Sequence, residues 1–502
     1  MLSHIKISII VFAILCTNVT LAWTQETQYL VGGYRNALPN PAAIAAAGGT
    51  WVGQIPSIGV AIARSGNPNF LTRVKKDKSV DLAGPDIEVR ISEDDTAEGT
   101  LGEEAITSQF EDQVTSDALP NDPFYFLQWP HRVMEIPSAH NRGITGEGIT
   151  IGVLGTGIDC SHPDLIRADG TPVVAFSISF VPRTCGAGES PPCFEDPCDV
   201  GVGTQENVDQ THETSVTGII AAQCNNGQGV CGIAPDAEIV NVKIYGKNEQ
   251  RSAPLSRILK SFDWTSTEGL SLGVRIINFS SSISCDDTDP LCKEKLIGSL
   301  GMANRMLSLV YKRGIVIFAS AGNEGVDFSQ TFGHFHWPAH DSPHTFPVGS
   351  TAPCCAACDG DLSNDNYDLF AAYSNHGFLP EEPFITMPGG NRPVSCFYPK
   401  PICQVGNLRL PCNAFDNVLT LTRKDVRPVP GIFGITAFNG TSAAAPHASA
   451  LAALLLSRMP DLSPGQLTEA MLGTGDLGID LTEDLGAPGY DVLFGHGRGR
   501  WF

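Results

Sequence analysis

The sequence predicts an α/β protein with a mostly parallel sheet that is covered by helices on both faces. Residues 149–154 and 239–244 are continuous apolar runs, which are typical of strands buried on both sides. Residues 297–312 have the pattern of a helix and lead directly into a third apolar run at 315–319. Strands and helices alternate in this way from about residue 119 to residue 502, so we assign this span to one large domain.

The chain begins with a pattern typical of a secretory signal peptide. Lys6 precedes an apolar stretch at 7–16, and Thr20, Leu21 and Ala22 form a small-residue cleavage site. The apolar stretch is too short to span a bilayer, and no later segment is long enough. We therefore expect residues 1–22 to be removed and the mature protein to be secreted or to stay in the secretory pathway.

Residues 23–92 predict a small α+β unit. Its expected elements are a strand at 29–32, a helix at 41–47, a β pair within 51–63, a helix at 67–78 capped by Asn67, and a closing strand at 87–89. This β-α-β-β-α-β order is typical of a ferredoxin-like sandwich. Residues 93–118 then carry nine acidic residues and no Lys or Arg, which predicts a solvated linker and a natural place for proteolytic maturation.

Composition and cysteine content limit the possible functions. A net charge of −22 argues against a nucleic-acid partner, which would need a basic face. Loss of Cys16 with the signal peptide leaves 14 of the 15 cysteines, an even number in an exported chain. We expect most of them to form disulfides, in a pairing that the sequence leaves open. Several lie in a loop-rich insertion near 354–420.

Ser442 stands directly before a long apolar helical run. A serine in that place lies beside free backbone N–H groups and the positive end of the helix dipole, which favour a developing oxyanion. The alternative from these residues alone is a side chain that merely caps a buried helix.

Three further segments accompany Ser442 in a fixed order along the chain. They contain Gly155-Thr156-Gly157, Asp209-Gln210-Thr211-His212 and Ala321-Gly322-Asn323. With these four segments, the chain resembles the subtilisin-like serine proteases (the subtilase or peptidase S8 family) from about residue 122 onward. The resemblance implies a subtilisin-like three-layer fold and peptide-bond hydrolysis. Residues 122–129 and 229–232 lean towards the kexin and proprotein convertase branch, and the unit at 23–92 resembles the family's inhibitor I9-like propeptide.

The resemblance also implies catalytic roles. Ser442 matches the nucleophile, His212 the general base, and Asn323 the side-chain donor of the oxyanion hole. The chemistry agrees, because an imidazole must accept the serine proton while amide groups stabilise the tetrahedral oxygen.

Residue 155 departs from the family pattern, which has the triad aspartate where this chain has Gly155. Loss of that carboxylate costs roughly 10⁴-fold in turnover in subtilisin itself. Three other acids could compensate. We expect Asp159 to cap a turn, Asp209 to bind a basic side chain of the substrate, and Glu213 to form only a strained hydrogen bond, because neighbouring residues on a helix point about 100° apart.

Two functions therefore remain open at the level of the sequence. The first is a secreted serine endopeptidase with strongly reduced turnover, in favour of which Ser442, His212 and Asn323 all survive. The second is a catalytically inactive pseudoprotease that binds peptides or regulates an active relative.

The resemblance further implies a peptide groove and a calcium site. Residues Asn278, Ser280, Ser281 and Ser282 match the edge strand that pairs with an extended peptide. Residues 286–287 either favour a basic substrate residue or form a solvated acidic loop. Structural Ca²⁺ is expected on hard oxygen ligands, namely the side chains of Asp164 and Asn226 and the backbone carbonyls of the loop that contains Cys224, Gln228 and Val230.

Overall fold

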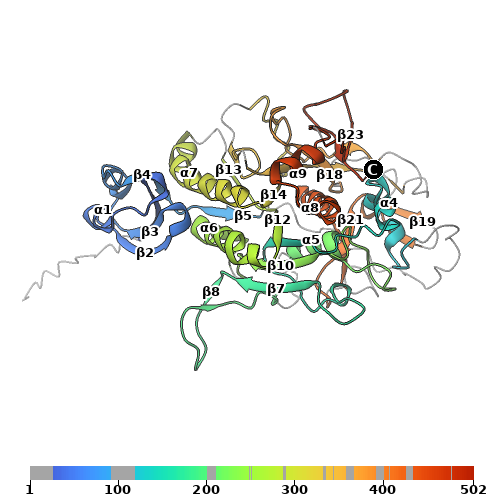
Figure 1. Cartoon of the computed structure of the whole chain (residues 1–502), viewed down its shortest axis with the longest axis horizontal. Coiled ribbons are helices and arrows are strands. Elements are labelled where there is room, and N and C mark those ends of the chain that lie inside the picture. Colours follow the sequence, from blue (N-terminus) through green and yellow to red (C-terminus); the bar gives the residue numbers. More distant parts are fainter. Residues whose placement is uncertain are drawn as a thin grey trace, which may run out of the picture.

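The computed structural model in Figure 1 describes residues 26–91, 119–200, 211–285 except 248 and 250, 290–331, 335–354 except 343, 356–357, 367–391, 401–425 except 406 and 407, and 434–501 except 476. The predictions for residues 1–22, 93–118, Asp209 and 286–287 lie outside these residues. Within the described residues, no helix combines the length and the apolar character needed to cross a membrane.

The centre of the large domain is a mostly parallel sheet, which confirms the predicted fold class. Its strands follow the order β23-β24-β18-β16-β14-β12-β6-β10-β7, with β17 added antiparallel at β16. The bounds are β6 (Thr150–Gly155), β7 (Val174–Ser179), β10 (Glu238–Lys243), β12 (Val274–Phe279), β14 (Val316–Ser320), β16 (Phe346–Ala352), β17 (Leu369–Phe370), β18 (Ile385–Pro388), β23 (Thr482–Glu483) and β24 (Arg498–Gly499). Strand β6 lies between β10 and β12 and is buried along its whole length.

Two layers of helices cover the sheet because its central strands are apolar on both faces. Ile151 and Val153 of β6 pack in one core with α5 (His212–Ala221) and α8 (Thr441–Arg458). Leu154 packs in the opposite core with α6 (Leu255–Trp264) and α7 (Pro290–Lys312). Helix α7 corresponds to the helix predicted at 297–312, but it begins earlier, at Pro290.

Short elements complete the large domain. The helices are α3 (Trp129–Val133), α4 (Ile136–His140) and α9 (Pro464–Met471). The two-stranded ribbons are β8 (Pro182–Arg183) with β9 (Cys193–Phe194), β13 (Ile283–Cys285) with β15 (Phe335–Trp337), β19 (Ile402–Val405) with β20 (Leu408–Pro411), and β21 (Val418–Leu421) with β22 (Ile435–Phe438). Disulfides among the described residues join Cys160 to Cys198, Cys185 to Cys193, Cys224 to Cys231, and Cys403 to Cys412.

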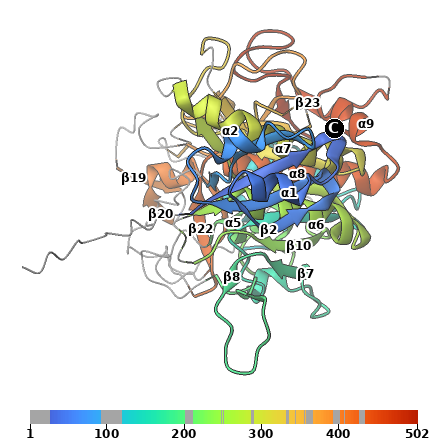
Figure 2. The same ribbon diagram turned by 90° about the vertical axis from the view of Figure 1, so that its left-hand side faces the viewer.

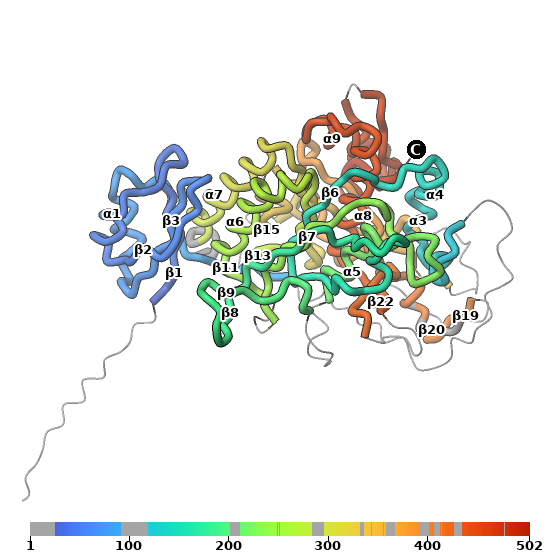
Figure 3. The backbone as a smooth tube through the Cα atoms, turned by 60° about the horizontal axis from the view of Figure 1, so that its bottom comes forward, coloured from blue at the N-terminus to red at the C-terminus, as the bar shows by residue number. Residues whose placement is uncertain are grey.

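The N-terminal unit is a separate four-stranded antiparallel sheet with two helices, and it forms one end of the molecule (Figures 1 and 3). Its elements are β1 (Thr27–Gly33), α1 (Pro41–Ala46), β2 (Thr50–Ile55), β3 (Val60–Ser65), α2 (Phe70–Val74) and β4 (Val80–Pro85). The order β2-β3-β1-β4 places the first and last strands side by side. Figure 2 faces this unit, whose strand β4 packs against α7 of the large domain.

Two predictions for this unit were wrong in detail. Helix α2 begins at Phe70, and Asn67 accepts a hydrogen bond from the Asn69 amide at 3.1 Å in the preceding turn. The closing strand is β4 and not residues 87–89, of which 88 and 89 lie on β5 (Glu88–Arg90). Strand β5 leaves the small sheet and pairs with β11 (Ser252–Pro254) of the large domain. Figure 1 shows β5 running from the N-terminal unit towards the large domain.

Candidate active site

Ser442 lies at the N-terminal end of α8, in its first turn, and is fully buried. The chain leaves β22 at Phe438 and reverses through Gly440, whose φ of 115° is a conformation that residues with a side chain rarely adopt. The helix therefore begins abruptly at Thr441, and Ser442 is presented with the N–H groups of the first turn around it. This confirms the predicted helix start but leaves the chemical role of Ser442 a prediction.

Asn323 is fixed beside this helix end. Its Oδ1 accepts hydrogen bonds from the Thr441 amide at 2.8 Å and from the Thr441 hydroxyl at 2.9 Å. The Gly322 amide donates to the same hydroxyl at 3.1 Å. Because the amide oxygen is held by two donors on Thr441, the orientation of the Asn323 side chain is fixed and its NH₂ group faces away from Thr441. A donor held in this way suits an oxyanion hole next to Ser442.

His212 is the first residue of α5, which packs along α8. Its ring meets the ring of Phe438 edge-on, with centroids 5.4 Å apart, and Phe438 lies four residues before Ser442. The imidazole is buried. The N-terminal ends of α5 and α8 and the loop after β14 thus meet at one edge of the sheet.

A carboxylate contacts the imidazole of His212. Glu213 Oε1 lies 2.7 Å from His212 Nδ1, and both side chains are buried. Glu213 Oε2 accepts a hydrogen bond from the backbone N–H of Thr156 at 2.6 Å and a second from the Thr156 hydroxyl. The histidine is therefore not left without an acid.

This finding corrects two expectations at Gly155 and Glu213. A Cβ atom built on Gly155 would lie 1.9 Å from Cδ of Glu213, so the glutamate carboxylate fills the space that a side chain at 155 would enter. The hydrogen bond that was expected to be strained forms at a distance of 2.7 Å, because the angle between neighbouring Cα–Cβ bonds does not fix the position of a carboxylate that is three torsions further out. Asp159 behaves as predicted, since it accepts from the Ser161 amide at 3.2 Å and hydroxyl at 2.8 Å.

Comparison with known proteins decides the family. The sequence profile of the subtilase family (peptidase S8) matches residues 146–497. The chain belongs to the subtilase family. This span includes Gly155, His212, Asn323 and Ser442.

Several curated subtilases are similar over most of the chain. Subtilisin Savinase of Lederbergia lenta is 28% identical over 351 residues, which cover 69% of this chain and 91% of that protein. Subtilisin E of Bacillus subtilis is 26% identical over 415 residues, with 80% of this chain and 81% of that protein covered. The match to M-protease of Shouchella clausii is 28% identical but spans only 64% of that relative's length.

Solved subtilase structures share the fold. Fervidolysin of Fervidobacterium pennivorans, described as a keratinolytic enzyme related to subtilisin, aligns with a TM-score of 0.61 at 17% identity, covering 95% of this chain and 60% of that one. A protease of Pseudoalteromonas arctica aligns with a TM-score of 0.52 at 22% identity, covering 76% and 97%. At these identities the likeness supports the fold alone.

The groove residues expected from the subtilase pattern lie together at the end of β12. Asn278 donates from Nδ2 to Ser280 Oγ at 3.1 Å and accepts from Ser449 on α8 at 3.0 Å. Ser281 is buried, and Ser282 pairs through its backbone with Arg90. The opposite wall, β11, was missed by sequence reasoning, because Ser252-Ala253-Pro254 carries no strand signal.

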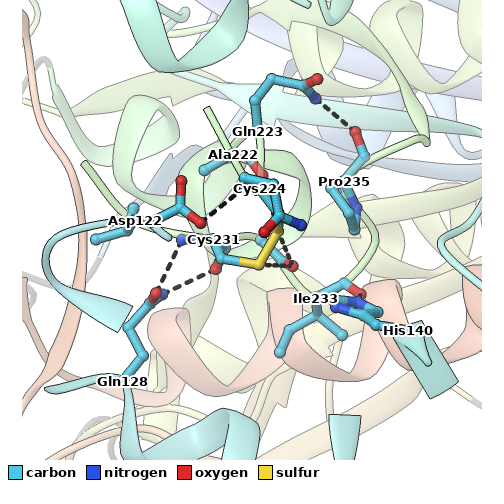
Figure 4. Close-up of a disulfide and its surroundings, with 12 residues drawn as sticks. Asp122, Gln128, His140, Ala222, Gln223, Cys224, Cys231, Ile233 and Pro235 are labelled. Atoms are coloured by element: carbon cyan, nitrogen blue, oxygen red, sulfur yellow. Dashed lines mark hydrogen bonds between the residues drawn. A yellow bond between two sulfur atoms is a disulfide. The ribbon is translucent and has the colours of Figure 1, made fainter. Parts of the chain in front are cut away.

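Two of the predicted calcium ligands, Asp164 and Asn226, meet where the loop closed by the Cys224–Cys231 disulfide passes Asp164. Figure 4 shows this disulfide. Asn226 Nδ2 lies 2.7 Å from Asp164 Oδ1, and the Val230 amide donates to Asp164 Oδ2 at 3.0 Å. Burial raises the pKa of Asp164 to about 7, so its charge lacks full compensation by these donors. A buried carboxylate next to an amide side chain, on a loop rich in backbone carbonyls, fits Ca²⁺ once the amide turns its oxygen inward.

A second grouping near this loop is not a metal site. His140, Cys224 and Cys231 have ligand atoms within 4.8 Å of one another. The two sulfur atoms form a disulfide, so neither is a thiolate that could bind a metal.

Proposed function

We propose that this protein is a secreted serine endopeptidase that hydrolyses peptide bonds through Ser442. The observation that carries the proposal is the assembly of four functional groups at one edge of the sheet. These are the serine at a helix N-terminus, the amide of Asn323 anchored on the adjacent Thr441, the imidazole of His212, and the carboxylate that contacts it.

The chemistry follows from these contacts. His212 accepts the proton of Ser442 as its Oγ attacks the carbonyl carbon of the substrate, and an acyl-enzyme forms when the amine leaves with that proton. Asn323 Nδ2 and the Ser442 backbone N–H stabilise the oxyanion of the tetrahedral intermediate. Water then repeats the sequence with the acyl group. The expectation of strongly reduced turnover loses its basis, because it rested on the absence of a carboxylate at Nδ1.

The substrate is an extended peptide that adds as a strand between β11 and residues 280–282. The N-terminal unit supports this role, because β5 lies in that place as part of the same chain. We propose that residues 23–92 act as an inhibitory propeptide. Secretion is supported by the signal-like sequence at 1–22 and by relatives that include the minor extracellular protease Epr of Bacillus subtilis.

Two finer assignments accompany the proposal. Placement near the kexin branch rests on residues 122–129, where Gln128 forms two hydrogen bonds of 2.8 Å with the backbone of Cys231. Structural Ca²⁺ would be held by Asp164, Asn226 and carbonyls of residues 224–230, where it would compensate the buried charge of Asp164.

The test is covalent labelling of the protein with a fluorophosphonate, with hydrolysis of a peptide library measured in parallel. Because β5 of the proposed propeptide lies in the groove, the full chain is first nicked with a Glu-specific protease in the acidic linker 93–118, and the N-terminal fragment is then separated from the large domain. We expect the native protein to label and to cleave peptides, Ser442→Ala to do neither, and Ser457→Ala on the same helix to behave as the native protein. Peptide binding without labelling or cleavage would contradict the proposal and establish the pseudoprotease.

A further inference from the structure

We propose that Glu213 is the third member of the catalytic triad, in place of the aspartate that relatives carry at the position of Gly155. In this chain the carboxylate is carried by the residue next to the histidine and not by the residue at the end of β6. The glycine at the end of β6 leaves room for it. This inference rests on the proposed function and names a residue and a geometry within it.

The contact with His212 is the first support. A carboxylate oxygen 2.7 Å from Nδ1 accepts a hydrogen bond from Nδ1–H, which fixes the neutral tautomer in which Nε2 is the basic nitrogen. When Nε2 takes the serine proton, the imidazolium faces a buried carboxylate. Both side chains are almost fully excluded from water, so this charge interaction is weakly screened.

The second support is the way in which the carboxylate is held. The Thr156 backbone N–H donates to Oε2 at 2.6 Å, and the Thr156 hydroxyl donates to the same oxygen. Thr156 directly follows Gly155, so the strand end that carries the acid in relatives here supplies the donors that position it. Helix α5 is tied to the same loop through the Asp159 amide, which donates to Thr214 Oγ1 at 3.0 Å.

The third support is steric. A Cβ atom at 155 would lie 1.9 Å from Glu213 Cδ and 2.0 Å from Oε1, so any side chain at 155 would force the Glu213 carboxylate out of its present position. Glu213 can therefore contact Nδ1 only because residue 155 has no side chain. A glutamate whose only role was to interact with the helix dipole at the start of α5 would not need the space beside Gly155.

The steric relationship yields a four-variant test on the nicked protein, with kcat and KM measured on one peptide. Glu213→Gln is expected to lower kcat by roughly 10³- to 10⁴-fold with KM changed less than about threefold, because the imidazole loses its partner but the groove is intact. Gly155→Asp alone is expected to lower kcat as well, since the new side chain displaces Glu213. The double variant Gly155→Asp/Glu213→Gly is expected to recover at least about 100-fold in kcat over Glu213→Gly.

The exposed Glu238→Gln is the matched control and should leave kcat unchanged. Near-native kcat in Glu213→Gln would overturn the inference, as would a gain of activity in Gly155→Asp alone. If Glu213→Gly fails to fold, which its circular dichroism would show, comparison of Glu213→Gln with Gly155→Asp decides the question. Failure of the proposed function is distinguishable, because the native protein would then not label at Ser442 at all.

Discussion

Arg90 and Ser282 exchange two backbone hydrogen bonds, from Arg90 N to Ser282 O at 3.1 Å and from Ser282 N to Arg90 O at 2.9 Å. On the other side of the same segment, Ile91 N donates to Arg251 O at 3.2 Å. The end of the N-terminal unit is thus the middle strand between two segments of the large domain. Its side chains alternate, with Val89 and Ile91 buried and Arg90 exposed.

The first prediction concerns inhibition by this strand. A separately produced fragment 23–92 should inhibit the mature protease, and Val89→Asp should raise its inhibition constant at least about 100-fold. The reason is that Val89 lies in an apolar core with Ala253 and Leu255, where an unpaired carboxylate costs several kcal/mol.

The matched control for this experiment is Glu88→Gln, because Glu88 is the exposed neighbour of Val89 on β5. Inhibition is measured as the loss of peptide hydrolysis on titration with each fragment. Equal inhibition constants for Val89→Asp and Glu88→Gln would show that β5 does not bind the groove of the mature protein.

Strands β6, β10 and β14 of the large sheet could be predicted from the sequence, because a strand buried on both faces is a continuous run of apolar residues. The partner of β5 could not, since the pattern of residues 87–89 is the same whichever strand it joins. The carboxylate at His212 could not be predicted for a related reason. It depends on the torsions of Glu213 and on space left by Gly155, which belongs to a different strand. A sequence motif identifies which residues take part in the site, but it does not show which of their side chains contact one another.

The second prediction is a loss of stability in acid caused by His447. This residue is fully buried on α8, its Nδ1 lies 2.8 Å from Ala443 O, and burial lowers its pKa to about 4. Below pH 6.5 this residue becomes protonated in the unfolded chain but stays neutral in the folded protein. The free energy of unfolding should therefore fall between about pH 6.5 and 4, by about 3 kcal/mol from this residue.

The measurement is urea unfolding at several pH values in the Ser442→Ala background, which prevents self-digestion. His447→Gln should show a shallower fall over this interval than the parent, because glutamine does not titrate. His131 is also buried, and burial holds its pKa well below the usual range. Part of the decrease in unfolding free energy should therefore remain in His447→Gln. Identical pH dependence of the parent and His447→Gln would contradict the prediction.

The third prediction is that calcium stabilises the protein increasingly as the pH rises. In chelator, the pKa of about 7 for Asp164 means that the folded state keeps a proton which the unfolded state loses near pH 4. Stability from this residue is therefore present at low pH and is lost as the pH rises through 7. Bound Ca²⁺ holds the carboxylate ionised, so millimolar Ca²⁺ should raise Tm by several degrees at pH 8 and by much less at pH 5.

Asp164→Asn should abolish the response to Ca²⁺, because the neutral side chain still accepts a hydrogen bond from Val230 but carries no charge for the cation. The variant should also be no less stable than the parent in chelator at pH 8, since its amide avoids the cost of a buried charge. Asp169→Asn, at an exposed turn, is the control and should retain the full response. A calcium response that survives in Asp164→Asn would place the cation elsewhere on the protein.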